Sequence, residues 1–255
     1  MRKSVRVHFP NARGERLAGI VDTNGSPKYF SIFSHCFTCS KDLKAIARIS
    51  RILAERGIGV LRYDYTGLGD SQGEFAETNF TTTCDDTVAA ARFLEQEYQA
   101  PKLLIGHSLG GTATYQVAGS VPSARAAVTI ASPSCTTHLS DFLSASDPDI
   151  DRLGQGTVVI GNRPIPITAQ LMNDLRSQDI PQRIREFPLP LLLIHSPADE
   201  TLPYWHSLNA LRWTEGRSSL LTLPGSNHLL TDEAADLALV AESIVAFADR
   251  YCLEP

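Results

Sequence analysis

The stretch LLIGHSLGGTATY, residues 103–115, places a serine among glycines where an apolar strand runs directly into a helix. Its centre fits the pattern G-x-S-x-G of a nucleophile elbow, a turn that strains the serine backbone and exposes the hydroxyl above the sheet. Gly106 and Gly110 are expected where only hydrogen fits, and Gly111 where the helix packs on the next strand. We predict that Ser108 is a nucleophile; the alternative is a glycine-rich turn with an idle serine.

A serine hydroxyl needs a base to take its proton, and His228 is the histidine best placed to do so. In elbow folds the order along the chain is serine, acid, histidine. His228 follows the last predicted strand, so we expect it in a surface loop at the same sheet edge as Ser108, where it carries little packing. Of the other downstream histidines, His195 lies inside an apolar strand and is expected to make a core hydrogen bond. His138 falls in an insertion and His206 on a helix.

The imidazole in turn needs a carboxylate that fixes its tautomer and stabilises its cation. Asp199 follows the apolar strand 190–196, at the same edge of the sheet. Glu200 is adjacent, but consecutive loop side chains diverge, and the shorter Asp199 is nearer the strand end. We predict that Asp199 is the acid; the alternative is that it caps a helix beginning near Pro203.

Acyl transfer also builds an oxyanion, which needs backbone N–H donors. We predict that Leu109, directly after the serine, supplies one donor. Phe37, in the loop HCFTCSKD (35–42), is predicted to supply the other. Both side chains are expected to line the substrate pocket. The alternative for Phe37 is a core residue in a simple connecting loop.

Strands and helices alternate along the chain, which predicts an α/β fold with a mostly parallel central sheet and helices on both faces. Strands are predicted at 4–9, 29–35, 59–65, 102–106, 126–132, 190–196 and 219–224, and helices at 40–57, 81–98, 109–119 and 233–252. The first strands lack intervening helices and are expected to form an antiparallel edge. Helix 40–57 is expected to begin at a Ser40 cap and stop at Gly57.

The segment 134–188 interrupts this alternation within what we expect to be one domain, 1–255. It contains a predicted hairpin over 157–167 that turns at Gly-Asn, followed by a short helix at 169–177. We predict that this segment forms a small cap-like insertion over the sheet edge. An excursion that serves packing alone is the alternative.

Composition is ordinary for a soluble protein: 255 residues, 43% hydrophobic, formal net charge −5. No basic cluster is visible, so no nucleic-acid partner is expected. No apolar run approaches the about twenty residues that span a bilayer, and no signal peptide is visible, so we expect a cytoplasmic protein without a membrane partner. The five scattered cysteines are expected to be reduced thiols. The oligomeric state stays open.

Two other motifs point to different chemistry. Cys36 and Cys39 form a C-x-x-C pair, which can be redox-active at a helix N-terminus, but no second pair completes a zinc site. Gly67 and Gly69 follow a strand, but Gln72 stands where a dinucleotide fingerprint needs its third glycine. We therefore predict neither a metal nor a cofactor.

Taken in order, the motifs HCFTC, YDYTGLGDSQG, GHSLGG, PADET and GSNHLL resemble the α/β-hydrolase superfamily across nearly the whole chain. More closely, FPNARGERLAGI and SHCFTCSKDLKAIARIS are similar to a bacterial subfamily of small esterase-like hydrolases, often fused to an OsmC-type domain. No such domain is expected here, because the chain ends at Pro255. The resemblance implies a Ser108–Asp199–His228 triad and cofactor-free hydrolysis of carboxylic esters. Cys36 departs from the commoner glycine after the loop histidine.

We therefore expect a serine carboxylesterase that acts on a small-molecule acyl ester. The bulky Phe37 and the short insertion favour short acyl chains. A thioesterase, a peptidase or another acyl hydrolase of the same fold is the nearest alternative. A non-hydrolytic ligand-binding protein and a thiol-redox protein acting through Cys36 and Cys39 are the alternatives from other classes.

Overall fold

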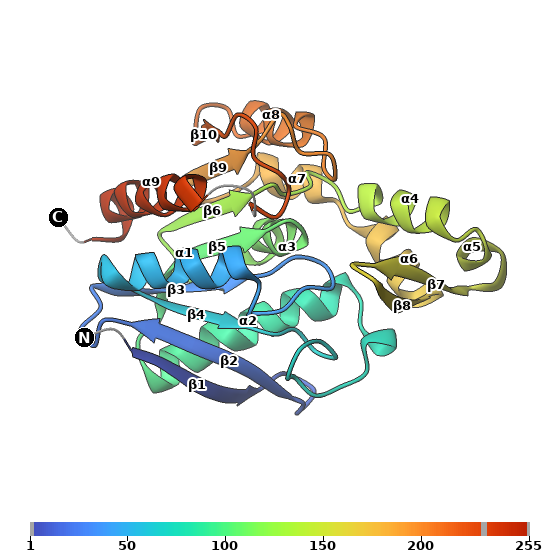
Figure 1. The fold of residues 1–255 in the computed structure, drawn as a ribbon, viewed down its shortest axis with the longest axis horizontal. Helices are drawn as coiled ribbons and strands as arrows, with labels where there is room; N and C mark the ends of the chain where they lie inside the picture. Colours follow the sequence, from blue (N-terminus) through green and yellow to red (C-terminus); the bar gives the residue numbers. More distant parts are fainter. Residues whose placement is uncertain (1–2, 231–233, 254–255) are drawn as a thin grey trace.

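A mostly parallel sheet forms the centre of the molecule (Figure 1). The structure, a computed structural model, describes residues 3–230 and 234–253. Within them eight strands pair in the order β1-β2-β4-β3-β5-β6-β9-β10. The strands are β1 (Lys3–Pro10), β2 (Arg16–Thr23), β3 (Tyr29–Ser34), β4 (Ile58–Tyr63), β5 (Pro101–His107), β6 (Ala126–Ile130), β9 (Leu191–His195) and β10 (Ser218–Thr222). Pairing is antiparallel for β1–β2 and β2–β4 and parallel for the other neighbours, as predicted.

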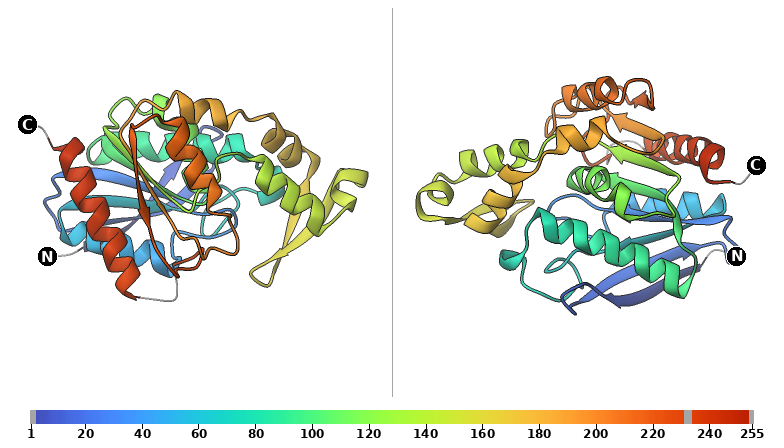
Figure 2. Two further views of the ribbon diagram at one scale, coloured as in Figure 1. Left: turned by 90° about the horizontal axis from the view of Figure 1, so that it is seen from above. Right: turned by 180° about the vertical axis from the view of Figure 1, so that it is seen from behind.

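Helices cover both faces of this sheet (Figure 2). On one face lie α1 (Lys44–Glu55) and α9 (Ala234–Cys252), and on the other lie α2 (Phe80–Glu97), α3 (Leu109–Val117) and α8 (Trp205–Trp213). Two short 3-10 turns, η1 (Phe75–Glu77) and η2 (Ala118–Ser120), adjoin α2 and α3. Neighbouring residues of β3 enter opposite layers: Ile32 packs with the α2–α3 side and Phe33 with the α1–α9 side. The central strands are mostly apolar because both of their faces are buried. The buried exception in β4 is Arg62, whose guanidinium binds Asp22 at 2.7 Å.

The register of the parallel strands brings their carboxyl ends to one edge. Ser34 of β3 pairs with Gly106 of β5, and Ile130 of β6 pairs with both His107 of β5 and Ile194 of β9. The loops that follow β3, β5 and β9 therefore begin side by side, although the chain separates them widely. This edge is where ligands bind in open α/β sheets.

The segment 134–188 forms an arm beyond this edge (Figures 1 and 2). Its elements are α4 (Thr137–Ser146), α5 (Asp149–Leu153), β7 (Gln155–Ile160), β8 (Arg163–Thr168), α6 (Ala169–Ser177) and α7 (Ile180–Arg185). The predicted hairpin and the helix at 169–177 are confirmed, and the hairpin turns at Gly161 and Asn162, whose φ values are 56° and 63°. Positive φ at both positions is the mark of a tight hairpin turn. Helices α4, α5 and α7 were not predicted.

Contacts with the main domain hold this arm in place. The Asp174 carboxylate accepts hydrogen bonds from the backbone N–H and the hydroxyl of Thr81, at 2.9 and 2.7 Å. The Gln170 amide donates to the carbonyl of Ala76 at 3.2 Å. These bonds join α6 to the start of α2 and to η1.

Helix α1 begins at Lys44, so the predicted cap at Ser40 is wrong. The cause lies in Lys41, whose backbone N–H and ammonium group both bind the buried carboxylate of Asp64, at 2.6 and 2.8 Å. This contact draws the chain into the preceding loop and delays the helix. The helix ends before Gly57, whose φ of 90° confirms the predicted stop.

Across the described residues, no helix combines the length and apolar character needed to cross a membrane.

Candidate active site

Ser108 stands at the turn between β5 and α3 with an unusual backbone. Its φ and ψ are 53° and −123°, a region that residues other than glycine rarely adopt. Its N–H donates to the carbonyl of Ile130 at the end of the neighbouring strand β6, at 2.8 Å. The sheet thus holds the strained serine in place.

The glycines around this turn are there for steric reasons, as predicted. A Cβ on Gly106 would overlap the carbonyl oxygen of Gly110, and one on Gly110 would overlap that of Ser34. A Cβ on Gly111 would overlap the hydroxyl of Ser132, just past β6. Only hydrogen fits at these three positions because the turn, the loop after β3 and the neighbouring strand meet there.

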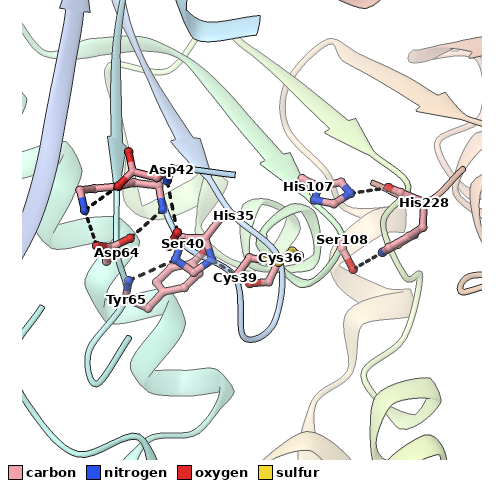
Figure 3. The surroundings of a disulfide bond; sticks show 11 residues. His35, Cys36, Cys39, Ser40, Asp42, Asp64, Tyr65, His107, Ser108 and His228 are labelled. Carbon is pink, nitrogen blue, oxygen red and sulfur yellow. Dashed lines mark hydrogen bonds and ion pairs between the residues drawn. A yellow bond between two sulfur atoms is a disulfide. The ribbon is translucent and has the colours of Figure 1, made fainter. Parts of the chain in front are cut away.

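The structure brings together the three side chains predicted for the site. Nε2 of His228 lies 3.1 Å from Oγ of Ser108, and Nδ1 of His228 lies 2.7 Å from Oδ2 of Asp199. His228 is 9% exposed, so the expectation of a surface position is wrong. Its ring lies 5.1 Å from that of His107, and its carbonyl accepts a bond from Nε2 of His107 at 2.8 Å (Figure 3).

The two oxygens of Asp199 have separate partners. Oδ1 accepts the backbone N–H groups of Thr201 and Leu202, both at 2.8 Å, and Oδ2 faces His228 and His195. Asp199 thus stabilises the turn after β9 with one oxygen and bonds His228 with the other. Its neighbour Glu200 is exposed. Burial alone would raise the pKa of Asp199, but the hydrogen bonds from His195 and His228 outweigh it and hold the pKa well below its ordinary value.

His195 is the site residue that the sequence did not reveal. It is buried, as predicted, but its Nε2 lies 3.2 Å from Oδ2 of Asp199 and 3.2 Å from the carbonyl of Leu202. Both neighbours are acceptors, so Nε2 carries the proton, and Nδ1 accepts a bond from the Ser207 hydroxyl at 2.9 Å. The available signal was the spacing H-x-x-x-D across the end of the strand.

The other histidines near the edge do not reach Ser108. Burial lowers the pKa of His107 to about 3, which keeps this ring neutral at its bond to the His228 carbonyl. The rings of His138 and His206 lie 5.0 Å apart, and Nδ1 of His206 meets Ser134. Burial likewise lowers the pKa of His206 to about 3.

Phe37 and Leu109, the two residues predicted to supply N–H donors, both line one small cavity. Neither the Phe37 N–H nor the Leu109 N–H donates to another group in the part of the chain that the structure describes. Both side chains line a cavity of about 20 Å³, together with Phe75 and, from the inserted arm, Leu171. That volume is little more than the room one water needs.

Cys36 and Cys39 form a disulfide, so the expectation of five reduced thiols is wrong for this pair (Figure 3). The loop after β3 turns sharply and brings their Cα atoms to 5.4 Å, the usual separation for a disulfide. Cys84, Cys135 and Cys252 are free, as expected. Over residues 3–230 and 234–253, no group of three or more His, Cys, Asp or Glu side chains is arranged to hold a metal ion.

A strained serine at the carboxyl edge of a parallel sheet, hydrogen-bonded to a histidine that in turn bonds an acid, defines the α/β-hydrolase class. A crystal structure of an esterase domain from a Rhodothermus marinus protein is 36% identical, with a TM-score of 0.79 over 98% of this chain and 100% of that one. The chain therefore belongs to the α/β-hydrolase superfamily and is a hydrolase related to this bacterial esterase domain.

More distant similarities are found in sequence and in structure. Residues 39–155 match the family described as serine aminopeptidase, S33. Est1E from Butyrivibrio proteoclasticus, solved with ferulic acid, is 19% identical, with a TM-score of 0.77 over 96% of this chain and 98% of that one. The uncharacterized protein YfhR of Escherichia coli K12 is 23% identical over 227 residues, which are 88% of this chain and 72% of YfhR.

Proposed function

We propose that this protein is a serine carboxylesterase that forms an acyl-enzyme on Ser108. The observation that carries the proposal is the continuous line of hydrogen bonds from Ser108 Oγ through His228 to Asp199, at 3.1 and 2.7 Å. A serine hydroxyl becomes a competent nucleophile when a base removes its proton as it attacks. The charged Asp199 stabilises the imidazolium that results.

The reaction then follows from these positions. Ser108 Oγ attacks the ester carbonyl, and its proton passes to Nε2 of His228. The N–H groups of Phe37 and Leu109, which have no acceptor among the described residues, hold the oxyanion. His228 returns the proton to the leaving alcohol, and a water activated by His228 releases the acid and restores Ser108.

Short acyl chains suit this site best. The cavity beside the two N–H donors has about 20 Å³ of free space, and Phe37 and Phe75 close it edge to face, with ring centroids 5.7 Å apart. Leu171 of the arm 134–188 closes another side, and this supports a cap-like role for the arm. A cytoplasmic location and a small-molecule ester as partner remain predictions.

A series of p-nitrophenyl esters of increasing acyl length tests the proposal. We expect turnover that is highest for the shortest acids, falls beyond medium chains, and is lost in Ser108→Ala. A preference for long chains would contradict the assignment of substrate class. Faster turnover of an acyl-CoA panel than of oxygen esters would show a thioesterase instead.

A further inference from the structure

We propose that the Cys36–Cys39 disulfide is a site of thiol–disulfide exchange with a dithiol reductant, and that its reduction disables the oxyanion site. The disulfide closes the turn that carries Phe37, one of the two N–H groups assigned to the oxyanion. This inference rests on the proposed function. It assigns a reactive site and its class of partner to a bond that ester hydrolysis itself does not use.

The turn lies between two firm anchors. On one side, burial lowers the pKa of His35 to about 4, and the neutral ring donates from Nδ1 to the carbonyl of Cys36 at 2.7 Å. On the other side, the ammonium group of Lys41 binds Asp64 and Asp70, at 2.8 and 2.7 Å. The first anchor also helps to orient the Phe37 N–H, because the Cys36 carbonyl and that N–H belong to one planar peptide unit. Neither anchor bond involves an atom of Thr38 or Cys39.

Between the anchors, the disulfide is the main restraint. The turn Cys36-Phe37-Thr38-Cys39 has one backbone hydrogen bond, from the N–H of Cys39 to the carbonyl of Cys36, at 3.3 Å. That distance lies beyond the usual range for an N–H···O bond and marks a weak interaction. The edge-to-face contact of Phe37 with Phe75 holds the ring of Phe37 but not its N–H.

Thr38 shows that the turn is under strain. Its φ is 89°, at the third position of the turn, where glycine or asparagine is preferred. A branched side chain is strongly disfavoured in this left-handed region. When the disulfide opens, Thr38 is free to return to negative φ. We expect this change to pull the peptide unit that carries the Phe37 N–H away from its place beside the elbow, against the bond from His35.

The chain immediately before the turn packs against the elbow, so the turn that carries Phe37 begins beside the site. A Cβ on Gly110 would overlap the carbonyl oxygens of Ser34 and His35, which immediately precede the turn. Figure 3 shows Cys36 and Cys39 on the loop that leads from His35. In this view the two cysteines lie between His35 and Ser108.

The two cysteines differ in exposure, and we expect this to set the order of the exchange. Cys36 is 5% exposed, whereas Cys39 is partly exposed. One thiolate of the reductant attacks Sγ of Cys39, forms a mixed disulfide there, and displaces the Cys36 thiolate, which takes up a proton. The second thiol of the reductant then displaces Cys39. The reductant ends as a disulfide, having given two electrons and two protons to Cys36 and Cys39.

Dithiothreitol is the probe for the test, because all five cysteines of the chain are accounted for and this pair forms the bond that can open. After full reduction, verified by alkylation and mass spectrometry, we expect kcat for a short p-nitrophenyl ester to fall by at least about 10-fold, toward the 10²–10³-fold cost of losing an oxyanion donor. KM should change less, and reoxidation should restore kcat.

Two variants sharpen this test. The double variant Cys36→Ser/Cys39→Ser should behave like the reduced enzyme. Thr38→Gly removes the strain, so after reduction it should keep much more of its kcat than the wild type does. Fully reduced wild type with unchanged kcat would overturn the proposal. So would reduction that unfolds the whole domain, seen as loss of far-UV circular dichroism. If instead the oxidised protein neither turns over esters nor forms an adduct at Ser108, the proposed function itself has failed.

Discussion

Nδ1 of His228 lies 2.7 Å from Oδ2 of Asp199, while the backbone N–H groups of Thr201 and Leu202 hold the other oxygen of the same carboxylate. The turn after β9 therefore sets the direction from which the carboxylate meets the imidazole. In the proposed mechanism, this keeps the proton on Nδ1 and leaves Nε2 free to accept a proton from Ser108.

Replacing Asp199 tests this arrangement. In Asp199→Asn the amide cannot supply the negative charge and no longer selects the same tautomer of His228, so we expect kcat to fall by about 10⁴-fold. Glu200→Gln is the matched control, because Glu200 is the exposed neighbour, and its kcat should be unchanged. Steady-state kinetics on one short ester compares the two. Equal losses in both variants would contradict the assignment of the acid.

The lowered pKa of Asp199 also predicts how stability depends on pH. Burial opposes the charge, but the bonds from His195 and His228 favour it, so the folded protein holds the proton of Asp199 less tightly than the unfolded chain does. The contribution of ionised Asp199 to the free energy of unfolding is therefore fully present above about pH 4, the ordinary pKa of aspartate. It is lost as the pH falls toward the lowered pKa of the folded protein. Urea unfolding should therefore show that wild type is more stable than Asp199→Asn at neutral pH. The difference between their free energies of unfolding should become smaller as the pH is lowered below about 4. A difference that stays constant would show that Asp199 gains nothing from its partners.

His195 should act on the reaction through Asp199. In His195→Phe, Oδ2 of Asp199 keeps His228 but loses its other donor. A hydrogen bond to a charged group contributes about 1.5–3 kcal/mol, so we expect kcat to fall by roughly 10- to 100-fold. His195→Gln offers an amide donor in place of Nε2–H and should recover part of the loss. If His195 has a purely structural role, its replacement should lower the free energy of unfolding. The kcat of the folded enzyme and the acid limb of its kcat–pH profile should then be unchanged. Kinetics across pH and urea unfolding of both variants separate these outcomes.

The elbow glycines make a prediction about packing. In Gly111→Ala the new methyl group would overlap the Ser132 hydroxyl, and overpacking of this kind destabilises by about 1–3 kcal/mol. Gly119 is a matched control, because no heavy atom lies within 4 Å of a Cβ there. Gly119→Ala should be neutral or stabilise by up to about 1 kcal/mol. Urea unfolding measures both, and equal effects would show that the close approach at Gly111 is relaxed in solution.

The residues of the site could be predicted because each belongs to a local motif at the end of a strand. The G-x-S-x-G turn forces a particular backbone, and parallel strands bring their carboxyl ends to one edge whatever the loops contain. Strand β2 was missed because its sequence RLAGIVDT is buried at all but its first residue and shows no alternation. The start of α1 was misplaced because Lys41 binds Asp64, a contact between segments far apart in the chain.

The role of His195 and the disulfide depend on side-chain directions that spacing alone does not determine. His195 meets Asp199 only because the turn after β9 folds back toward the strand. Cysteines three positions apart are compatible with free thiols and with a bond, and the tight turn at Phe37 and Thr38 decides between them. A disulfide in a cytoplasmic protein is usually transient, catalytic or redox-sensing, so the predicted cytoplasmic location and the proposed exchange at Cys39 would be consistent with each other.

Reaction with a fluorophosphonate, followed by mass spectrometry of the peptides, tests the central claim most directly. The account predicts one adduct on Ser108, absent in Ser108→Ala and formed far more slowly in His228→Ala. Because His228 is buried, circular dichroism must first show that this variant is folded. An adduct on another residue, or an equal labelling rate in folded His228→Ala, would contradict the claim that Ser108 is activated by His228.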